Sequence, residues 1–250
     1  YYLKNKSFER PHGDGIKINL SSPDAFEELI WAENIKEYEK GNFSQKLNSE
    51  YVNDILKNEL TRSINKILIL RKKKIYLSKG NYNLFRINYI KKILRNSLFI
   101  ICIRNPLNVI ESSIRVHKKF LELGNKNRDF TNEMNELCHF EFGKNRKDPF
   151  GGYLETDEYK YYEKQWINTH EMILKKYIDL ENVFLIDFDK FVDSPDKSLL
   201  IISKNINVDI SSNINKVLKK INKSNQILLN NNKNKKILNI YNQLLNNCIN

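Results

Sequence analysis

Residues that break or cross-link the backbone are scarce in this chain. Its 250 residues include eight glycines, five prolines and three cysteines. So little glycine and proline argues against a collagen-like or linker composition. A hydrophobic content of 40% is enough for a packed core. Cys102, Cys138 and Cys248 lie far apart and form no C-x-x-C pair, so they predict no disulfide framework. This cysteine usage favours a reducing, cytoplasmic compartment, and leaves an N-terminal targeting signal open.

Metal-ligand spacing and membrane-length apolar runs are also missing. The histidines are His12, His117, His139 and His170, and none has the spacing of a zinc ligand pair. No apolar run approaches the roughly 20 residues that a membrane helix needs. A G-x-x-x-x-G-K-[ST] phosphate-binding loop is absent. We therefore expect neither a metal nor a membrane span in this chain.

Basic residues exceed acidic residues, with a formal net charge of +12 and a pI of about 9.4. Such a balance is compatible with nucleic acid, an acidic membrane or a phosphorylated ligand. Lysine, asparagine and isoleucine are abundant together, which is typical of an AT-rich genome as much as of a selected basic surface. Charge alone therefore predicts no specific nucleic-acid partner.

The most informative segment is 97–114, which reads SLFIICIRNPLNVIESSI. The apolar run 98–103 predicts a strand that ends at Arg104. Asn105 and Pro106 turn the chain, and apolar residues then return at helical spacing. Ligands of open α/β sheets bind at such strand ends. Arg104, the helix N-terminus and Ser112, eight residues further on, predict an anion site.

This segment resembles the PAPS-dependent sulfotransferases. In that family an arginine at a strand end and a serine eight residues later hold the 3′-phosphate of the sulfate donor, as Arg104 and Ser112 would here. Asn105 replaces the commoner aspartate. The stretch 75–86, IYLSKGNYNLFR, resembles the preceding strand and its lysine-bearing turn. Lys79 matches the lysine that lies near the transferred sulfate in relatives, whereas Gly80 departs from the usual asparagine.

Two further segments extend the resemblance. Residues 182–196, NVFLIDFDKFVDSPD, are similar to the family's late strand and acidic-aromatic turn, with Asp187 and Phe188 carrying the match. Residues 21–31, SSPDAFEELIW, resemble an acceptor-side helix in which a glutamate acts as general base. Glu28 is the better match for that base, with Glu27 beside it.

The resemblance implies a fold, a reaction and a donor. The fold is α/β: a three-layer, P-loop-like arrangement with a central parallel sheet flanked by helices, and helical C-terminal additions. The reaction is sulfuryl transfer from PAPS, 3′-phosphoadenosine 5′-phosphosulfate, to a hydroxyl or amine of a glycan, lipid or small-molecule acceptor, without a metal. Lys79 would neutralise charge near the leaving group. Arg146 and Lys144, in an insertion, would be lid residues able to reach a phosphate.

One part of the family pattern is missing. The 5′-phosphosulfate loop that follows the first strand is absent, and Gly13 and Gly15 in HGDGIK do not supply it. We therefore interpret the chain as a fragment of a single domain, 1–250, that lacks an upstream strand–loop–helix unit. Two alternatives stay open. A P-loop nucleotide or metabolite kinase would need an upstream Walker loop, and a non-catalytic basic binding module would bind nucleic acid with steep salt dependence.

Periodicity predicts the remaining elements. Strands are expected at 75–78, 98–103 and 183–187, and their separation by helices predicts parallel pairing. The stretches 1–20 and 124–153 are expected to be irregular, the latter as a lid. A polar linker is expected at 230–236 inside a helical C-terminal extension, 206–250. Helices are expected at 24–35, 50–70, 84–95, 158–179, 197–205, 214–221 and 237–245.

Overall fold

The computed structural model describes residues 7–19, 27–35, 47, 50, 53–152, 154–209 and 235–250. The chain divides into two compact units. The first comprises Tyr1–Asn96 and Ser113–Leu154, and the second comprises Ser97–Ser112 and Glu155–Asn250. The described part of the first unit is mostly helical with a small hairpin, whereas the second contains a parallel sheet.

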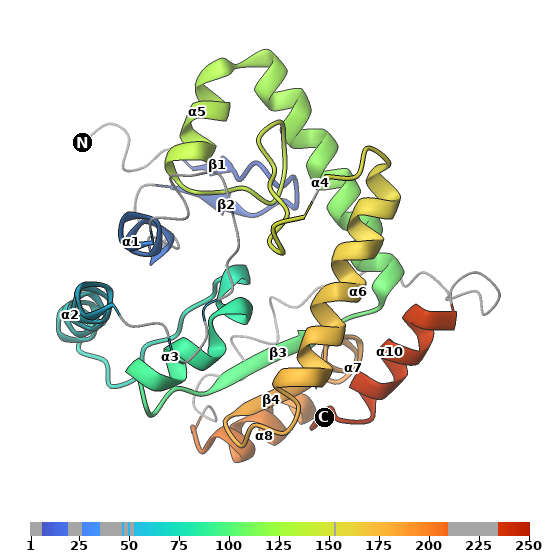
Figure 1. The fold of residues 1–250 in the computed structure, drawn as a ribbon. Helices are drawn as coiled ribbons and strands as arrows, with labels where there is room; N and C mark the ends of the chain where they lie inside the picture. Colours follow the sequence, from blue (N-terminus) through green and yellow to red (C-terminus); the bar gives the residue numbers. More distant parts are fainter. Residues whose placement is uncertain are drawn as a thin grey trace. The chain divides into compact units, whose positions relative to one another are not determined.

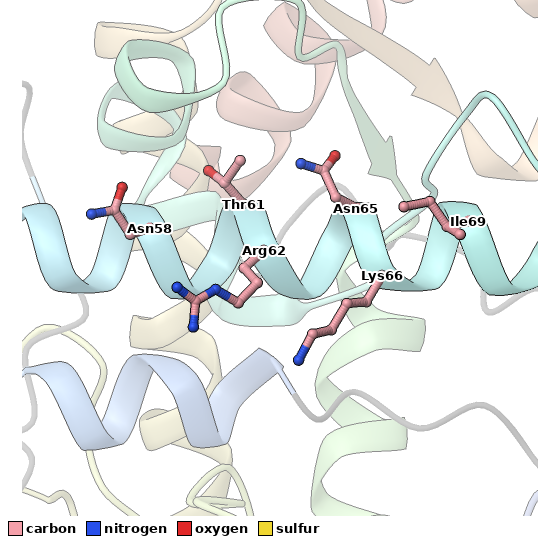
Figure 2. A pocket seen from close by; sticks show the side chains of 6 residues that line it. All are labelled: Asn58, Thr61, Arg62, Asn65, Lys66 and Ile69. Carbon is pink, nitrogen blue, oxygen red and sulfur yellow. The ribbon is translucent and has the colours of Figure 1, made fainter.

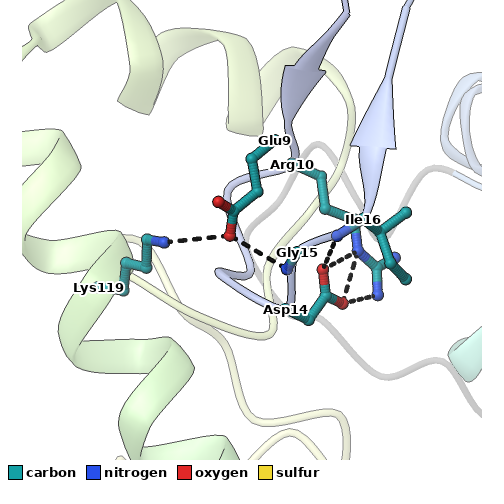
Figure 3. A network of polar contacts seen from close by, with 6 residues as sticks. All are labelled: Glu9, Arg10, Asp14, Gly15, Ile16 and Lys119. Atoms are coloured by element: carbon teal, nitrogen blue, oxygen red, sulfur yellow. Dashed lines mark hydrogen bonds and ion pairs between the residues drawn. The ribbon is translucent and has the colours of Figure 1, made fainter. Parts of the chain in front are cut away.

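A hairpin opens the described part of the first unit. Strands β1 (Phe8–Glu9) and β2 (Lys17–Ile18) pair antiparallel. In the turn between them, the Arg10 guanidinium donates to the Asp14 carboxylate, and the Glu9 carboxylate accepts the Gly15 N–H at 3.2 Å (Figure 3). The guanidinium lowers the pKa of Asp14. The expectation that 1–20 is entirely irregular is therefore wrong, because two-residue strands are too short to show alternation.

Helices α1 (Glu27–Asn34) and α2 (Asp54–Arg71) contact each other in the first unit. Asn53 caps α2, because its side-chain oxygen accepts the Leu56 N–H at 2.9 Å. The same amide donates to the carbonyl of Asn34 at 2.9 Å, which ties the end of α1 to the start of α2. Trp31 and Leu56 are buried. The helix expected at 50–70 is confirmed, and the described part of 24–35 is helical as well.

The segment after α2 forms no strand, so the strand expected at 75–78 is wrong. Residues 75–80 are irregular, and Ile75 and Leu77 are exposed. A segment with an alternating apolar pattern forms a strand only when a neighbouring strand pairs with its backbone. Among the described residues, no strand pairs with this segment. A 3₁₀ helix, η1 (Asn81–Phe85), and helix α3 (Ile87–Ile93) follow, where a helix at 84–95 was expected.

Two helices span most of residues 106–136. Helix α4 (Pro106–Lys126) begins in the second unit, and its residues from Ser113 onward belong to the first. Helix α5 (Arg128–Glu136) starts at Asn127, whose side chain accepts the Asp129 N–H at 2.9 Å. The expectation of an irregular 124–153 is wrong for residues 128–136. Their polar sequence has no clear apolar periodicity, and the cap at Asn127 was not identified from the sequence.

The second unit is built on strands β3 (Phe99–Ile103) and β4 (Val183–Asp187). They pair parallel, with Phe99 opposite Val183 and Ile103 opposite Asp187, as the separation by helices predicts. The C-terminal residues lie on the other side of β4, where Cys248 bridges to Leu185. Both expected strands are confirmed.

Helices cover this sheet. Helix α6 (Glu158–Lys176) lies beside α10 (Lys235–Leu245), and α10 also contacts β3 and β4 (Figure 1). Short helices α7 (Phe188–Asp193) and α8 (Pro195–Ile206) follow β4. The helices expected at 158–179, 197–205 and 237–245 are confirmed. The helix expected at 214–221 lies outside the described residues, as does the expected linker up to residue 234, and Lys235 and Lys236 already belong to α10.

The fold is therefore mixed α/β, with a parallel sheet of two strands in the described part of the chain. Its core in the second unit is made of side chains from both strands and the covering helices. These are Ile103, Ile110, Tyr161, Trp166, Ile173, Leu185, Ile237, Ile240 and Leu244. The finer three-layer, P-loop-like arrangement stays a prediction.

Replacing Lys72 by glycine should stabilise the protein. Lys72 follows α2 in the left-handed conformation, with φ of 51°, and its N–H donates to the Ile69 carbonyl at 3.1 Å. A side chain there costs about 1–2 kcal/mol, partly offset by the larger conformational entropy of unfolded glycine. We expect Lys72→Gly to raise the free energy of unfolding by about 0.5–1 kcal/mol in urea. Lys73→Gly is the matched control and should give no gain; equal effects of both changes would contradict the explanation.

Candidate functional site

The turn after β3 is held by Asn105. Its side-chain oxygen accepts the N–H groups of Leu107 at 3.0 Å and Asn108 at 3.3 Å, and its carbonyl accepts the Val109 N–H at 3.1 Å. Pro106 opens α4 and has no N–H to satisfy. The first amides of α4 are thus already bonded within the protein. An anion at this turn would depend on side chains rather than on the helix N-terminus.

An aspartate from the first turn of α7 holds the Asn105 turn. The N–H of Asn105 donates to the Asp189 carboxylate at 3.0 Å, and the hydroxyl of Tyr241 donates to the same oxygen at 3.3 Å. Asp187 caps α7 by accepting the N–H groups of Asp189 and Lys190. Burial, with the negative charges of Asp189 and Asp187, raises the pKa of Tyr241. The parallel strands end at the same edge, so these two turns meet there.

Arg104 and Ser112 both belong to the second unit: Arg104 directly follows β3, and Ser112 lies further along α4. The Arg104 guanidinium lies over the Phe188 ring, 5.2 Å from its centroid. Nothing in the sequence indicated that Phe188 would lie next to Arg104. Ser112 is half-buried on α4. Ser112 is four residues after Asn108, so the two side chains lie on the same face of α4. It is about 9 Å from Pro106 along the helix axis.

In the first unit, Glu27 accepts hydrogen bonds from the segment that carries Lys79. The Glu27 carboxylate accepts from the hydroxyl of Tyr76, and from the Ser78 hydroxyl at 2.5 Å. Ser78 in turn accepts from the side-chain amide of Asn83 at 3.1 Å. The exposed Lys79 lies within this turn. Burial and the neighbouring Glu27 carboxylate raise the pKa of Tyr76.

Glu28, the residue favoured as general base, is an ion-pair partner. Its two carboxylate oxygens each accept from the Arg86 guanidinium at 2.9 Å. Arg86 has 0% of its surface exposed, and its guanidinium stacks over Trp31, 4.5 Å from the ring centroid. Such a bidentate pair satisfies a buried charge and fixes α1 against the start of α3. The geometry therefore gives Glu28 a structural task and leaves Glu27 as the glutamate at the Lys79 turn.

Arg146 also belongs to the first unit. Its guanidinium lies 3.1 Å from Nε2 of the buried His117, whose Nδ1 accepts the Gly143 N–H at 3.1 Å. Lys144 is exposed on the same irregular segment. Arg146 thus helps to hold this segment on α4, in a different unit from Arg104 and Ser112.

A shallow hollow of about 480 Å³ lies on α2 of the first unit (Figure 2). None of the candidate residues lines it. Its lining comes from one exposed helix face, namely Asn58, Thr61, Arg62, Asn65, Lys66 and Ile69.

Comparisons with known proteins identify no relative: no family model, curated protein or solved structure matches the chain. Within the described ranges, no helix is long and apolar enough to cross a membrane. No group of three potential metal ligands is found among the residues that the structure describes.

Sequence reasoning missed three residues that organise these sites, Arg86, Asp189 and His117. Arg86 stands between Phe85 and Ile87 in a buried stretch, which is a signal that it needs an acidic partner. Its partner is 58 residues away, so only the fold identifies it. Asp187 ends β4, and Asp189 follows two residues later. The sequence does not show which of the two caps α7 and which accepts the N–H of Asn105.

Removing the Glu28 carboxylate should destabilise the first unit. Glu28→Ala leaves the buried Arg86 charge without its carboxylate, which costs about 3–5 kcal/mol. Glu27→Ala is the matched control from the same helix turn and should cost about 1 kcal/mol, because Glu27 accepts hydrogen bonds at a more exposed position. Urea unfolding curves of the two variants measure the difference. Equal small losses would show that the Arg86 pair contributes little.

Proposed function

We propose that the protein is a sulfotransferase, which moves a sulfuryl group from PAPS to a hydroxyl or amine of a glycan, lipid or small-molecule acceptor. The observation that carries the proposal is the Arg104 turn. An arginine follows the end of a parallel strand, and a serine stands eight residues later on the next helix of the same unit. The resemblance of segment 182–196 supports the same reading. In segment 75–86 the support is limited to the turn that carries Lys79, because residues 75–78 form no strand.

Arg104 and Ser112 suit the 3′-phosphate of this donor. A guanidinium presents several N–H donors in a fixed fork that matches phosphate oxygens, and a serine hydroxyl adds one more donor. The Phe188 ring, 5.2 Å away, restrains the arginine. Because Asn105 already bonds the first amides of α4, these two side chains supply the binding and its geometry.

Two residues of the first unit are proposed for the chemistry on grounds of the family resemblance. Lys79 is a compact positive charge that would neutralise the charge developing on the leaving group. Glu27 would take the proton of the acceptor, in place of Glu28, which Arg86 holds. The donor supplies a sulfuryl group that is already attached to a phosphate leaving group, so the residues proposed here include no metal ligand.

Loss of the Arg104 side chain should weaken binding of adenosine 3′,5′-bisphosphate, the product of the donor. Removing a hydrogen bond to a charged group costs about 1.5–3 kcal/mol, which is roughly a 10- to 150-fold rise in Kd. Isothermal titration calorimetry with Arg104→Ala measures this change. Arg128→Ala, on the exposed start of α5, is the control and should bind like the wild type. An unchanged affinity of Arg104→Ala would remove Arg104 from the site.

Lys79→Ala should reduce turnover and leave donor binding nearly unchanged, because a cation near the transferred group acts mainly in the transition state. Release of adenosine 3′,5′-bisphosphate from PAPS, followed with a panel of glycan, lipid and small-molecule acceptors, measures turnover. Lys57→Ala, on exposed α2, is the control. Full turnover in Lys79→Ala would exclude this role.

A further inference from the structure

The net charge of the chain is concentrated in one fifth of its length. Between Glu59 and Glu111 there is no acidic residue, while twelve basic residues occur. They are Arg62, Lys66, Arg71, Lys72, Lys73, Lys74, Lys79, Arg86, Lys91, Lys92, Arg95 and Arg104. Because the whole chain has 42 basic and 30 acidic residues, the rest of the sequence is balanced. An AT-rich composition would spread lysine along the chain, so this concentration calls for a local cause.

Large apolar side chains are exposed within the same segment. Ile69 is 75% exposed, Leu70 80% and Leu77 88%, and Ile67 and Ile75 are exposed as well. These five residues flank the run of Arg71, Lys72, Lys73 and Lys74, all of which are exposed. We call residues 66–77, which span the end of α2 and the irregular segment after it, the 66–77 surface. It combines five basic and five exposed apolar residues within the first unit.

The local structure does not require this composition. A cation in the last turn of α2 is favoured by the helix dipole, which accounts for Arg71 but not for Lys73 and Lys74 beyond the helix. Lys72 occupies a left-handed position that glycine would fill at lower cost. The Tyr76 hydroxyl donates a hydrogen bond to Glu27 and so holds the segment on α1, while its neighbours Ile75 and Leu77 are exposed.

We propose that the 66–77 surface is a docking site for a membrane surface that contains anionic lipids. Clustered lysines and arginines are attracted to the negative lipid headgroups, and exposed aliphatic side chains enter the boundary between headgroups and acyl chains. The hollow on α2 shares Lys66 and Ile69 with this surface and adds Arg62, which makes a basic patch suited to a lipid phosphate (Figure 2).

Aliphatic side chains favour a lipid over a nucleic acid as the partner. Nucleic-acid surfaces combine basic residues with aromatic rings on which bases stack, whereas the exposed apolar residues here are isoleucine and leucine. Exposed aliphatic side chains beside clustered lysines are typical of interfacial binding. The inference is independent of the proposed sulfotransferase activity, because the 66–77 surface contains none of Glu27, Lys79, Arg104 and Ser112.

The test is co-sedimentation of the full chain with vesicles of phosphatidylcholine alone, or with 30% phosphatidylserine. The wild type should bind the anionic vesicles, and added salt should weaken binding. Arg71→Gln/Lys72→Gln/Lys73→Gln/Lys74→Gln should lower the partition coefficient by about fivefold for each charge removed. The matched control, Lys175→Gln/Lys176→Gln/Lys197→Gln/Lys204→Gln, removes the same number of exposed charges from α6 and α8 and should bind like the wild type.

A second variant tests the apolar part of the surface. Ile69→Ser/Leu70→Ser/Leu77→Ser keeps every charge and should reduce binding at least tenfold, since three exposed side chains no longer insert. Circular dichroism confirms that each variant is folded. Equal losses in the charge variant and its control, no binding of the wild type, an unchanged apolar variant, or a preference for a single-stranded oligonucleotide over anionic vesicles would each overturn the proposal.

Discussion

The hydrogen bond from the Asn105 N–H to the Asp189 carboxylate is the interaction on which the candidate donor site depends. Parallel pairing of β3 and β4 puts the two strand ends at one edge, and this bond joins the turns that follow them. The joined turns leave Arg104 against Phe188 and direct α4, with Ser112, away from the edge. Asn105 also caps α4. The same residue therefore fixes the direction of the helix and accepts the N–H groups of its first residues, Leu107 and Asn108.

Neighbouring glutamates of α1 have different tasks in the first unit. Successive residues of a helix point in directions about 100° apart, so Glu28 reaches the buried Arg86 while Glu27 reaches the Ser78 hydroxyl. The buried pair holds the helix in place, and the exposed pair shapes the Lys79 turn. This division is why the proposed general base is Glu27, while Glu28 has a structural role as the partner of Arg86.

Local patterns in the sequence were enough to predict the elements around Arg104. The apolar run 98–103, the Asn-Pro turn and the periodicity after it predict a strand, a turn and a helix, because these elements depend on contacts between near neighbours. The strand expected at 75–78 failed because Ile75 and Leu77 are exposed, and a pattern does not reveal whether another element covers it. The Arg86–Glu28 pair and the Asp189 bond join residues 58 and 84 positions apart, so they follow from the fold alone.

The central claim is that the Arg104 turn binds the donor's phosphate. Titrating the isotopically labelled full chain with adenosine 3′,5′-bisphosphate, while following backbone amide shifts by NMR, tests it most directly. The account predicts saturable shifts at Arg104, Asn105 and Ser112, with no change at the exposed amides of α8. Shifts confined to the 66–77 surface, or no saturable shift at any amide, would contradict it.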